Sequence, residues 1–286
     1  MRSVVITGTS SGIGWGAAKV LVNNGFRVFG SVRRNEDAQR LRAEFGPTFV
    51  PLLFDVTDED AVKKAAAEVR VAIGGEALFG LVNNAGVAVA GPLLELPLEE
   101  FRRQIEINLI GVVSTTQAFA PLLKATGEQG ASAGRILNIS SVGGRIGNLF
   151  LAPYVASKFA LEGLSESLRR ELLPLGIDVI VIAPGAIATS IWSKAQEIDL
   201  TPYSNTPYAL ALERMRAYML ALGKKGLPPE KIGETVMHVL TTARPKVRYA
   251  VTPRPLQDWL ARNLPKRFVD RMIGRRLGLL PRTIHS

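Results

Sequence analysis

The chain has 286 residues, a formal net charge of +10, 47% hydrophobic residues and 21% charged residues. These values indicate a globular protein with a substantial core. There is no cysteine and there are two histidines, His238 and His285, which excludes disulfides, cysteine-ligated metals and a serine–histidine–aspartate triad. Any general acid or base must therefore be another type of residue.

Short β-branched runs alternate with segments of helical period. Buried strands are predicted at 3–7, 27–32, 48–54, 77–83, 135–140, 178–183 and 247–251, and helices at 12–23, 36–45, 58–73, 98–123, 154–175 and 229–241. Strands separated by helix-length crossovers predict an α/β fold, a single doubly wound Rossmann-type domain with a parallel β-sheet. In such sheets the ligand lies beyond the carboxyl ends of the strands.

The chain is expected to form one domain over residues 1–252, followed by a basic extension over 253–286. A glycine-rich stretch at 125–134 predicts an exposed loop. The N-terminus enters a strand at once, leaving no room for a targeting peptide, and no apolar stretch is long enough to span a membrane. We therefore expect a cytoplasmic protein, with peripheral membrane contact as a further option.

The first strand runs into a glycine-rich turn, VVITGTSSGIG, at the head of a predicted helix. Glycines at this place let the backbone approach a pyrophosphate, and the helix N-terminus offers free N–H groups and a partial positive charge. The spacing differs from GxGxxG, and a plain strand-to-helix turn is the alternative. The residues expected to bind a dinucleotide here are Gly8, Ser10, Ser11, Gly12, Ile13 and Gly14.

The end of the second strand indicates which dinucleotide binds. NAD-selective sheets often place a carboxylate after this strand, whereas this chain has Val32, Arg33 and Arg34. Arg33 is suited to binding a 2′-phosphate through charge-assisted hydrogen bonds. We therefore expect NADP(H) in preference to NAD(H), with simple solvation of the arginines as the alternative.

Six motifs occur in order between about residues 3 and 190, and together they resemble the short-chain dehydrogenase/reductase family. They are TGTSSGIG (7–14), FDV (54–56), NNAG (83–86), INLIG (107–111), ISSVGG (139–144) with YVASK (154–158), and APGAIAT (183–189). The resemblance, closest to hydroxysteroid and retinol dehydrogenase-like members, implies an NADP(H)-dependent oxidoreductase that acts on a carbonyl or secondary alcohol. It also implies further cofactor contacts from Asp55, Val56, Asn83, Ala85, Gly86, Pro184, Gly185, Ile187 and Thr189. A helix-capping role for Asp55 and a strand-ending role for NNAG are the structural alternatives.

Tyr154 and Lys158 are four residues apart on a predicted helix, so their Cβ atoms share a face about 5–6 Å apart. Without a suitable histidine, proton transfer to an alkoxide needs a tyrosine whose pKa, about 10 in water, is brought towards neutrality. A neighbouring ammonium favours the phenolate and moves a pKa by about 1–3 units. The spacing therefore predicts a lowered pKa for Tyr154.

The resemblance assigns the remaining roles. Tyr154 would be the general acid/base, and Lys158 would also bind the nicotinamide ribose. Ser141 would orient the substrate oxygen, and Asn108 would hold a water that relays protons to the lysine. For Ser140 a structural role at the strand end is expected.

Residues 186–227 occupy the position of the family's substrate lid. They include Ile191, Trp192, three tyrosines and two methionines, which predict an apolar pocket for a steroid, retinoid, fatty or terpenoid substrate. The alternative is that these side chains pack against the body or another subunit. A 3-oxoacyl thioester reductase and a non-catalytic NADP(H)-binding sensor or scaffold are the rival functions.

The C-terminal tail is basic and amphipathic. Residues 244–286 hold 11 basic and two acidic residues, and therefore +9 of the net charge of +10. Apolar residues follow helical spacing on both sides of Pro265: Leu256, Trp259, Leu260 and Leu264 before it, and Phe268, Met272 and Ile273 after it. Docking on the pocket or on a partner subunit is the favoured interpretation, contact with an anionic membrane is the second, and no motif supports nucleic-acid binding. The family norm predicts a homodimer or homotetramer.

Overall fold

The computed structural model describes residues 1–123, 134–189 and 199–280. Most of the predicted loop at 125–134 and two lid residues, Ile191 and Trp192, lie outside the described residues.

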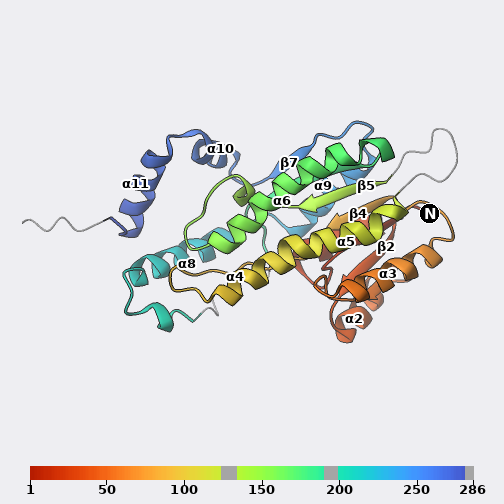
Figure 1. Ribbon diagram of the computed structural model, residues 1–286, viewed down its shortest axis with the longest axis horizontal. Coiled ribbons are helices and arrows are strands. Elements are labelled where there is room, and N and C mark those ends of the chain that lie inside the picture. The colour runs from red at the N-terminus through yellow and green to blue at the C-terminus, as the bar shows by residue number, and fades with distance from the viewer. Residues whose placement is uncertain (124–133, 190–198, 281–286) are drawn as a thin grey trace, which may run out of the picture.

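Seven parallel strands form one sheet in the order β3-β2-β1-β4-β5-β6-β7 (Figure 1). The strands are β1 (Ser3–Ile6), β2 (Arg27–Val32), β3 (Phe49–Leu53), β4 (Gly80–Asn83), β5 (Arg135–Ile139), β6 (Asp178–Pro184) and β7 (Arg248–Val251). In the register of the central strands, Val4 lies opposite both Val28 and Gly80. The strand order reverses at β1, and the crevice at that switch point is where such sheets bind their ligands. The predicted α/β class is confirmed.

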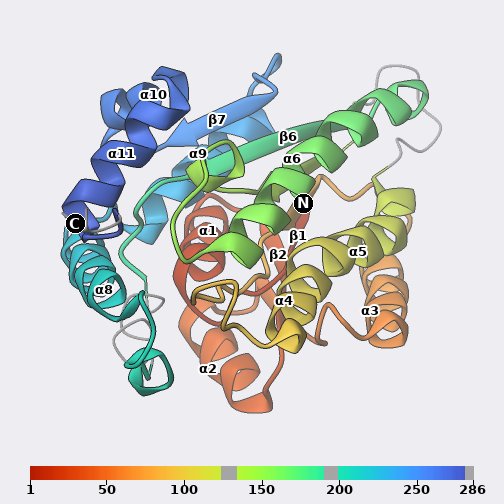
Figure 2. The ribbon, with the colours of Figure 1, turned by 60° about the vertical axis from the view of Figure 1, so that its left-hand side comes forward.

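Helices cover both faces of the sheet (Figure 2). The helices of the body are α1 (Gly12–Asn23), α2 (Asn35–Phe45), α3 (Glu59–Ala72), α4 (Leu98–Ile105), α5 (Gly111–Phe119), α6 (Ala152–Glu171) and α9 (Pro229–Thr241). Alternate strand residues enter different cores: Val4 packs with side chains of α1, α2 and α9, while Val5 packs with those of α3 and α5. This alternation follows from the two-residue period of a strand and explains why the strands are apolar on both faces.

Six of the seven predicted strands begin and end within one residue of the observed bounds. For the strand predicted at 77–83, the observed strand begins three residues later, at Gly80. The predicted helix at 98–123 differs more, because a π-helical turn, η1 (Glu106–Ile110), interrupts it. The turn directs Asn108 into the interior, where it is buried. Such π-helical insertions often mark functional sites.

The lid and tail lie together at one end of the molecule (Figures 1 and 2). The lid contains a helix that its sequence did not predict, α8 (Ala209–Lys224), and the tail forms α10 (Pro255–Asn263) and α11 (Lys266–Leu277), divided at Pro265 as predicted. A third hydrophobic cluster joins these parts: Leu277 of α11 and Leu212 of α8 pack with Phe150 from the segment before α6. Within the described part of the chain, no helix combines the length and apolar character needed to cross a membrane.

Candidate active site

The glycine-rich turn after β1 lies tightly against two other predicted cofactor segments. Gly8 and Gly12 have φ angles of +71° and +61°, which side-chain-bearing residues rarely adopt. A Cβ on Gly8 would lie 2.9 Å from Ala85 Cα, and one on Gly12 would lie 3.3 Å from Thr189 Cγ2. The structure thus brings residues 8–14, NNAG and APGAIAT together at the switch point.

The first turn of α1 is suited to an anion. Ser11 is the N-cap of α1, but its side chain accepts no hydrogen bond from the helix, and it is exposed. N–H groups at such a helix start attract phosphate. Arg40 of α2, which the sequence did not single out, donates to the Ser10 carbonyl at 2.7 Å and adds positive charge beside the turn.

Arg33 and Asp55, both predicted to contact the adenosine end, lie next to each other. Arg33 Nη1 is 3.5 Å from Asp55 Oδ2, and the Arg33 side chain is 69% exposed. Asp55 also accepts hydrogen bonds from the amide and hydroxyl of Thr57. The residue that caps α3 is Asp58, so the capping alternative for Asp55 is wrong.

A buried polar layer supports the ends of β4 and β5. Asn83 Nδ2 donates to Asn138 Oδ1 at 2.9 Å and to Thr116 Oγ1 at 3.1 Å. Asn138 Nδ2 in turn donates to Ser165 Oγ of α6 at 2.9 Å. Because the Asn83 side chain is committed to this layer, its predicted cofactor contact rests on its backbone.

The π-helical turn uses the Asn108 amide to hold the segment that follows NNAG. Asn108 Oδ1 accepts from the Val87 amide at 2.9 Å, and Nδ2 donates to the Val87 carbonyl at 3.0 Å and to Ser157 Oγ at 3.2 Å. Gln104, one turn earlier, also donates to the Val87 carbonyl. The predicted relay water therefore has to meet the backbone of Asn108 rather than its amide.

Tyr154 and Lys158 share a face of α6, as their spacing predicts. Lys158 Nζ lies 5.8 Å from the centroid of the Tyr154 ring and donates a hydrogen bond of 2.8 Å to the Ile139 carbonyl at the end of β5. Burial lowers the pKa of Lys158 to about 8, and the negative charge of Glu162 opposes this shift. The lysine is thus held over the tyrosine ring by a hydrogen bond to a backbone carbonyl.

The predicted direction of the tyrosine shift is wrong in this structure. Burial raises the pKa of Tyr154, and a hydrogen bond with the Ser141 hydroxyl opposes this rise. The spacing of Tyr154 and Lys158 reveals the nearby positive charge but not the cost of removing a phenolate from water, which here is the largest effect. The phenol therefore stays in its protonated form, as an ordinary tyrosine does at neutral pH.

Ser141 lies on a short segment that follows β5. Its Oγ accepts a hydrogen bond of 3.0 Å from the Gly143 amide at the start of η3 (Val142–Gly144). Ser140 continues the β-ladder through a bond from its amide to the Ile182 carbonyl, in agreement with a role at the strand end.

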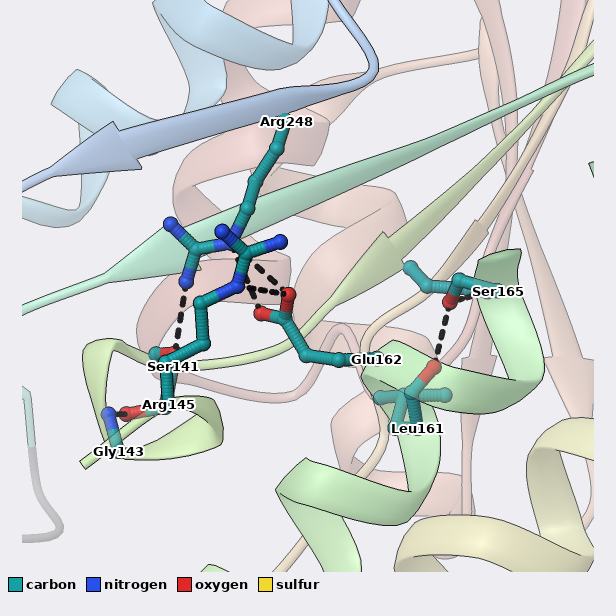
Figure 3. Close-up of polar contacts among 8 residues, drawn as sticks. Ser141, Gly143, Arg145, Leu161, Glu162, Ser165 and Arg248 are labelled. Carbon is teal, nitrogen blue, oxygen red and sulfur yellow. Dashed lines mark hydrogen bonds and ion pairs between the residues drawn. The ribbon is translucent and has the colours of Figure 1, made fainter. Parts of the chain in front are cut away.

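Glu162, one helical turn beyond Lys158, joins three parts of the site (Figure 3). Arg248 Nε of β7 lies 3.0 Å and 2.9 Å from the two Glu162 oxygens, and Arg145 Nε lies 3.1 Å from Oε2. Arg248 Nη2 also donates to the Ser141 carbonyl at 3.4 Å. This group was not predicted from the sequence. Glu162 does lie eight residues after Tyr154 on the same helix, but its partner Arg248 is 86 residues further along the chain, so no local pattern links the two.

An apolar hollow of about 280 Å³ lies beside the start of α6, between the segment after η3 and the lid. Leu93, Leu94, Leu149 and Phe150 line it together with Tyr208 of the lid. Tyr203 and Met215 of the lid pack in the third cluster together with Tyr208 but do not line this hollow. A larger hollow of about 370 Å³ lies within the lid, between residues 199–204 and α8, and none of the residues that line it belongs to the site described above.

Comparisons with known proteins agree with this geometry. A family model described as short chain dehydrogenase matches residues 2–199. An NADPH-dependent 3-dehydrocapnine reductase from Ornithobacterium rhinotracheale is 39% identical over 273 residues, which cover 95% of this chain and 96% of that protein. A short-chain dehydrogenase from Streptomyces avermitilis has a TM-score of 0.75 at 26% identity and 97% coverage of both chains. A 3-ketoacyl-(acyl-carrier-protein) reductase from Brucella melitensis, complexed with NADH, has a TM-score of 0.72 at 25% identity, with 88% of this chain and 96% of that chain covered.

Proposed function

The chain belongs to the short-chain dehydrogenase family, and from this premise we propose that it transfers a hydride between NADP(H) and the carbonyl or secondary alcohol of a hydrophobic substrate. The observation that carries the proposal is the convergence of Ser141, Tyr154 and Lys158 at the carboxyl end of β5, next to the crevice at the switch point. A sensor or scaffold protein on this fold would not need a phenol that is hydrogen-bonded to a serine hydroxyl and has an ammonium over its ring.

The residues of the site fit a nicotinamide dinucleotide. The turn at 8–14 and the first turn of α1 would hold the pyrophosphate, Arg33 the 2′-phosphate and Lys158 the nicotinamide ribose. The cofactor supplies the hydride when it is bound. Ser141 orients the substrate oxygen, and Tyr154 donates the proton that the new alkoxide requires.

The phenol of Tyr154 carries its proton at neutral pH, because burial raises a pKa that ordinarily already lies near 10. It can therefore donate that proton to a new alkoxide. The balance between ketone and alcohol depends on the ratio of oxidised to reduced cofactor, and the name of the Ornithobacterium relative, a reductase, supports reduction as the direction for this chain.

Two observations support NADP(H). Arg33 directly follows β2 with its guanidinium largely exposed, and the Ornithobacterium relative is named for NADPH. The Brucella structure carries NADH, so the fold accepts either dinucleotide.

Arg33→Ala is expected to lower the ratio of kcat/KM for NADPH over NADH by at least tenfold, since the charge-assisted hydrogen bonds to the 2′-phosphate are worth about 1.5–3 kcal/mol. An unchanged ratio would remove Arg33 from cofactor selection. Val32 is a poor place to add a carboxylate because its side chain is buried in the core.

The apolar hollow beside α6 supports a hydrophobic substrate. The decisive experiment follows NADPH oxidation by the purified protein with lipophilic ketones, 3-dehydrocapnine, a 3-oxoacyl thioester and a short polar ketone. We expect turnover with the lipophilic ketones and little with the polar one. Preference for the thioester would favour the 3-oxoacyl reductase alternative. Cofactor binding without turnover of any compound would favour the non-catalytic one.

A further inference from the structure

The tail carries an unusual set of exposed apolar side chains, which we call the tail face. It consists of Leu256, Trp259, Leu260, Phe268 and Met272, with exposed fractions of 69%, 54%, 38%, 57% and 51%. In α10 the first three recur at the spacing of one helix face, and Phe268 and Met272 do so in α11. Each of the two helices thus presents an apolar stripe to solvent, and exposed apolar side chains in such number indicate a binding site.

The opposite side of α11 is fixed to the protein. Leu277 is buried and Ile273 half-buried in the third hydrophobic cluster, against Ala211 and Leu212 of α8. Arg276 lies over the Tyr218 ring at 5.3 Å, which adds a second contact with the lid helix. Within the tail face, Phe268 and Met272 are therefore presented by a helix that is already docked on the lid, at the end of the molecule away from α2 and α3 (Figures 1 and 2).

Unpaired cations accompany the tail face. Arg262, Arg267, Arg271 and Arg275 are exposed, and none of them forms an ion pair with another described residue. The region from 244 to the C-terminus carries +9. A second copy of the tail would bring the same charge to the contact, and like charges repel at close range. An occupant that carries negative charge and also offers an apolar interior matches both the cationic and the apolar groups.

We propose that the tail face docks on the surface of an anionic lipid bilayer, with α10 and α11 lying in the plane of the interface. Trp and Phe are suited to the boundary between headgroups and acyl chains, and arginines beside them meet the lipid phosphates. Each arginine near such a surface strengthens binding about fivefold, which corresponds to ~1 kcal/mol. The docking would keep the lid next to the bilayer, and it does not depend on the proposed activity.

The experiment measures co-sedimentation of the full chain with phosphatidylcholine vesicles that contain about one third phosphatidylglycerol, and with phosphatidylcholine alone. We expect binding to the anionic vesicles, weakened by salt because exposed charges are screened. Trp259→Glu with Phe268→Glu should abolish it. Arg267→Ala with Arg271→Ala should weaken it about 30-fold, from the two charges lost.

Val71→Glu is the matched control, because Val71 is an exposed apolar residue on α3, outside the tail. It should bind vesicles like the wild type. Circular dichroism and cofactor binding show whether each variant folds. Equal binding to neutral and anionic vesicles, no binding at low salt, or wild-type binding by the Glu double variant would overturn the proposal. So would a dimer in solution that the Glu double variant dissociates, since the tail face would then belong to a second copy.

A separate observation concerns Glu162. Among the described residues, it is the only carboxylate that pairs with both Arg145 and Arg248 (Figure 3). Arg248 also donates a hydrogen bond to the carbonyl of Ser141. We infer that Glu162 is a positioning residue: it holds the Ser141 segment against α6 and keeps negative charge one turn from Lys158. The charged groups around Lys158 are then Glu162 on its own helix and, through it, Arg145 and Arg248.

Glu162→Gln tests this role because it keeps the size of the side chain and removes its charge. We expect kcat to fall about tenfold or more, as for a catalytic group displaced by a fraction of an ångström, with little change in KM for NADPH. Glu162 raises the pKa of Lys158, so the alkaline limb of the pH–rate profile should move to lower pH. Glu162→Asp should recover part of the kcat.

Glu166→Gln is the control, since Glu166 lies one turn further along α6 and pairs with Arg170 at the surface. It should leave kcat and the pH profile unchanged. A Glu162→Gln protein that is less stable but has the wild-type kcat and pH profile would reduce Glu162 to a structural ion pair.

Discussion

The carboxyl ends of the central strands and the lid–tail end of the molecule are held together in different ways. Around β4 and β5, buried polar side chains such as Asn83, Asn138 and Ser165 each have specific hydrogen-bond partners. The lid and tail are joined mainly by the apolar contacts of the third cluster and by Arg276 over the Tyr218 ring, and they leave apolar side chains in solvent. A buried polar group tolerates few substitutions, whereas apolar contacts of similar volume are interchangeable. The first region can therefore be recognised from short sequence motifs, whereas the second cannot.

Replacing one tyrosine in each region by phenylalanine should give the largest difference between the two regions, measured as the loss of kcat. Tyr154→Phe removes the proton donor, and we expect kcat to fall by about 10²–10⁴-fold or more. Tyr208→Phe, in the lid, removes a hydroxyl from the apolar hollow and should change kcat by less than about tenfold. Steady-state kinetics measure both effects, and titration of cofactor fluorescence shows whether Tyr154→Phe still binds the dinucleotide. Near-normal turnover by Tyr154→Phe would remove this residue from the mechanism.

The same contrast explains what sequence could predict. The bounds of six of the seven strands, the division of the tail at Pro265 and the shared face of Tyr154 and Lys158 all follow from local periods and from proline, and the structure confirms them. Properties that depend on tertiary surroundings did not follow. Neither the π-helical turn that places Asn108 in the interior nor the burial that raises the pKa of Tyr154 can be seen in the local spacing of residues.

The second effect concerns stability and pH in the first region. The pKa of Lys158 is about 8 in the folded protein and 10.5 ordinarily, so between these values the unfolded chain binds more protons. Stability must then rise with pH across this window, by about 3 kcal/mol for this group, because burying the ammonium is costly below pH 8. Lys158→Met has no ammonium to bury, so its stability lacks this dependence on pH. In urea unfolding, the stability of the wild type relative to Lys158→Met should therefore increase by about 3 kcal/mol from pH 7.5 to 10.5.

Lys63→Met is the control for that series. Lys63 is 65% exposed on α3, and surface substitutions usually change stability by less than ~0.5 kcal/mol. A difference between Lys158→Met and the wild type that stays constant from pH 7.5 to 10.5 would contradict the burial of the ammonium.

The smallest effect tests the joint between the two regions, Phe150. It has a φ of +60°, the only non-glycine residue with positive φ in the described chain, and its ring meets Tyr208 edge-on at 6.0 Å. Phe150→Ala and Phe150→Gly lose the same ring contacts, but alanine keeps the strain of about 1–2 kcal/mol that a side chain has in this conformation. The glycine variant should thus be the more stable by about 1 kcal/mol. At Leu161, inside α6, the order should reverse, because glycine destabilises a helix by about 1 kcal/mol relative to alanine. Thermal unfolding of the four variants measures both differences. If alanine is the better residue at both positions, the strain at Phe150 does not exist in solution, and the lid is held to the body by apolar packing without a strained joint.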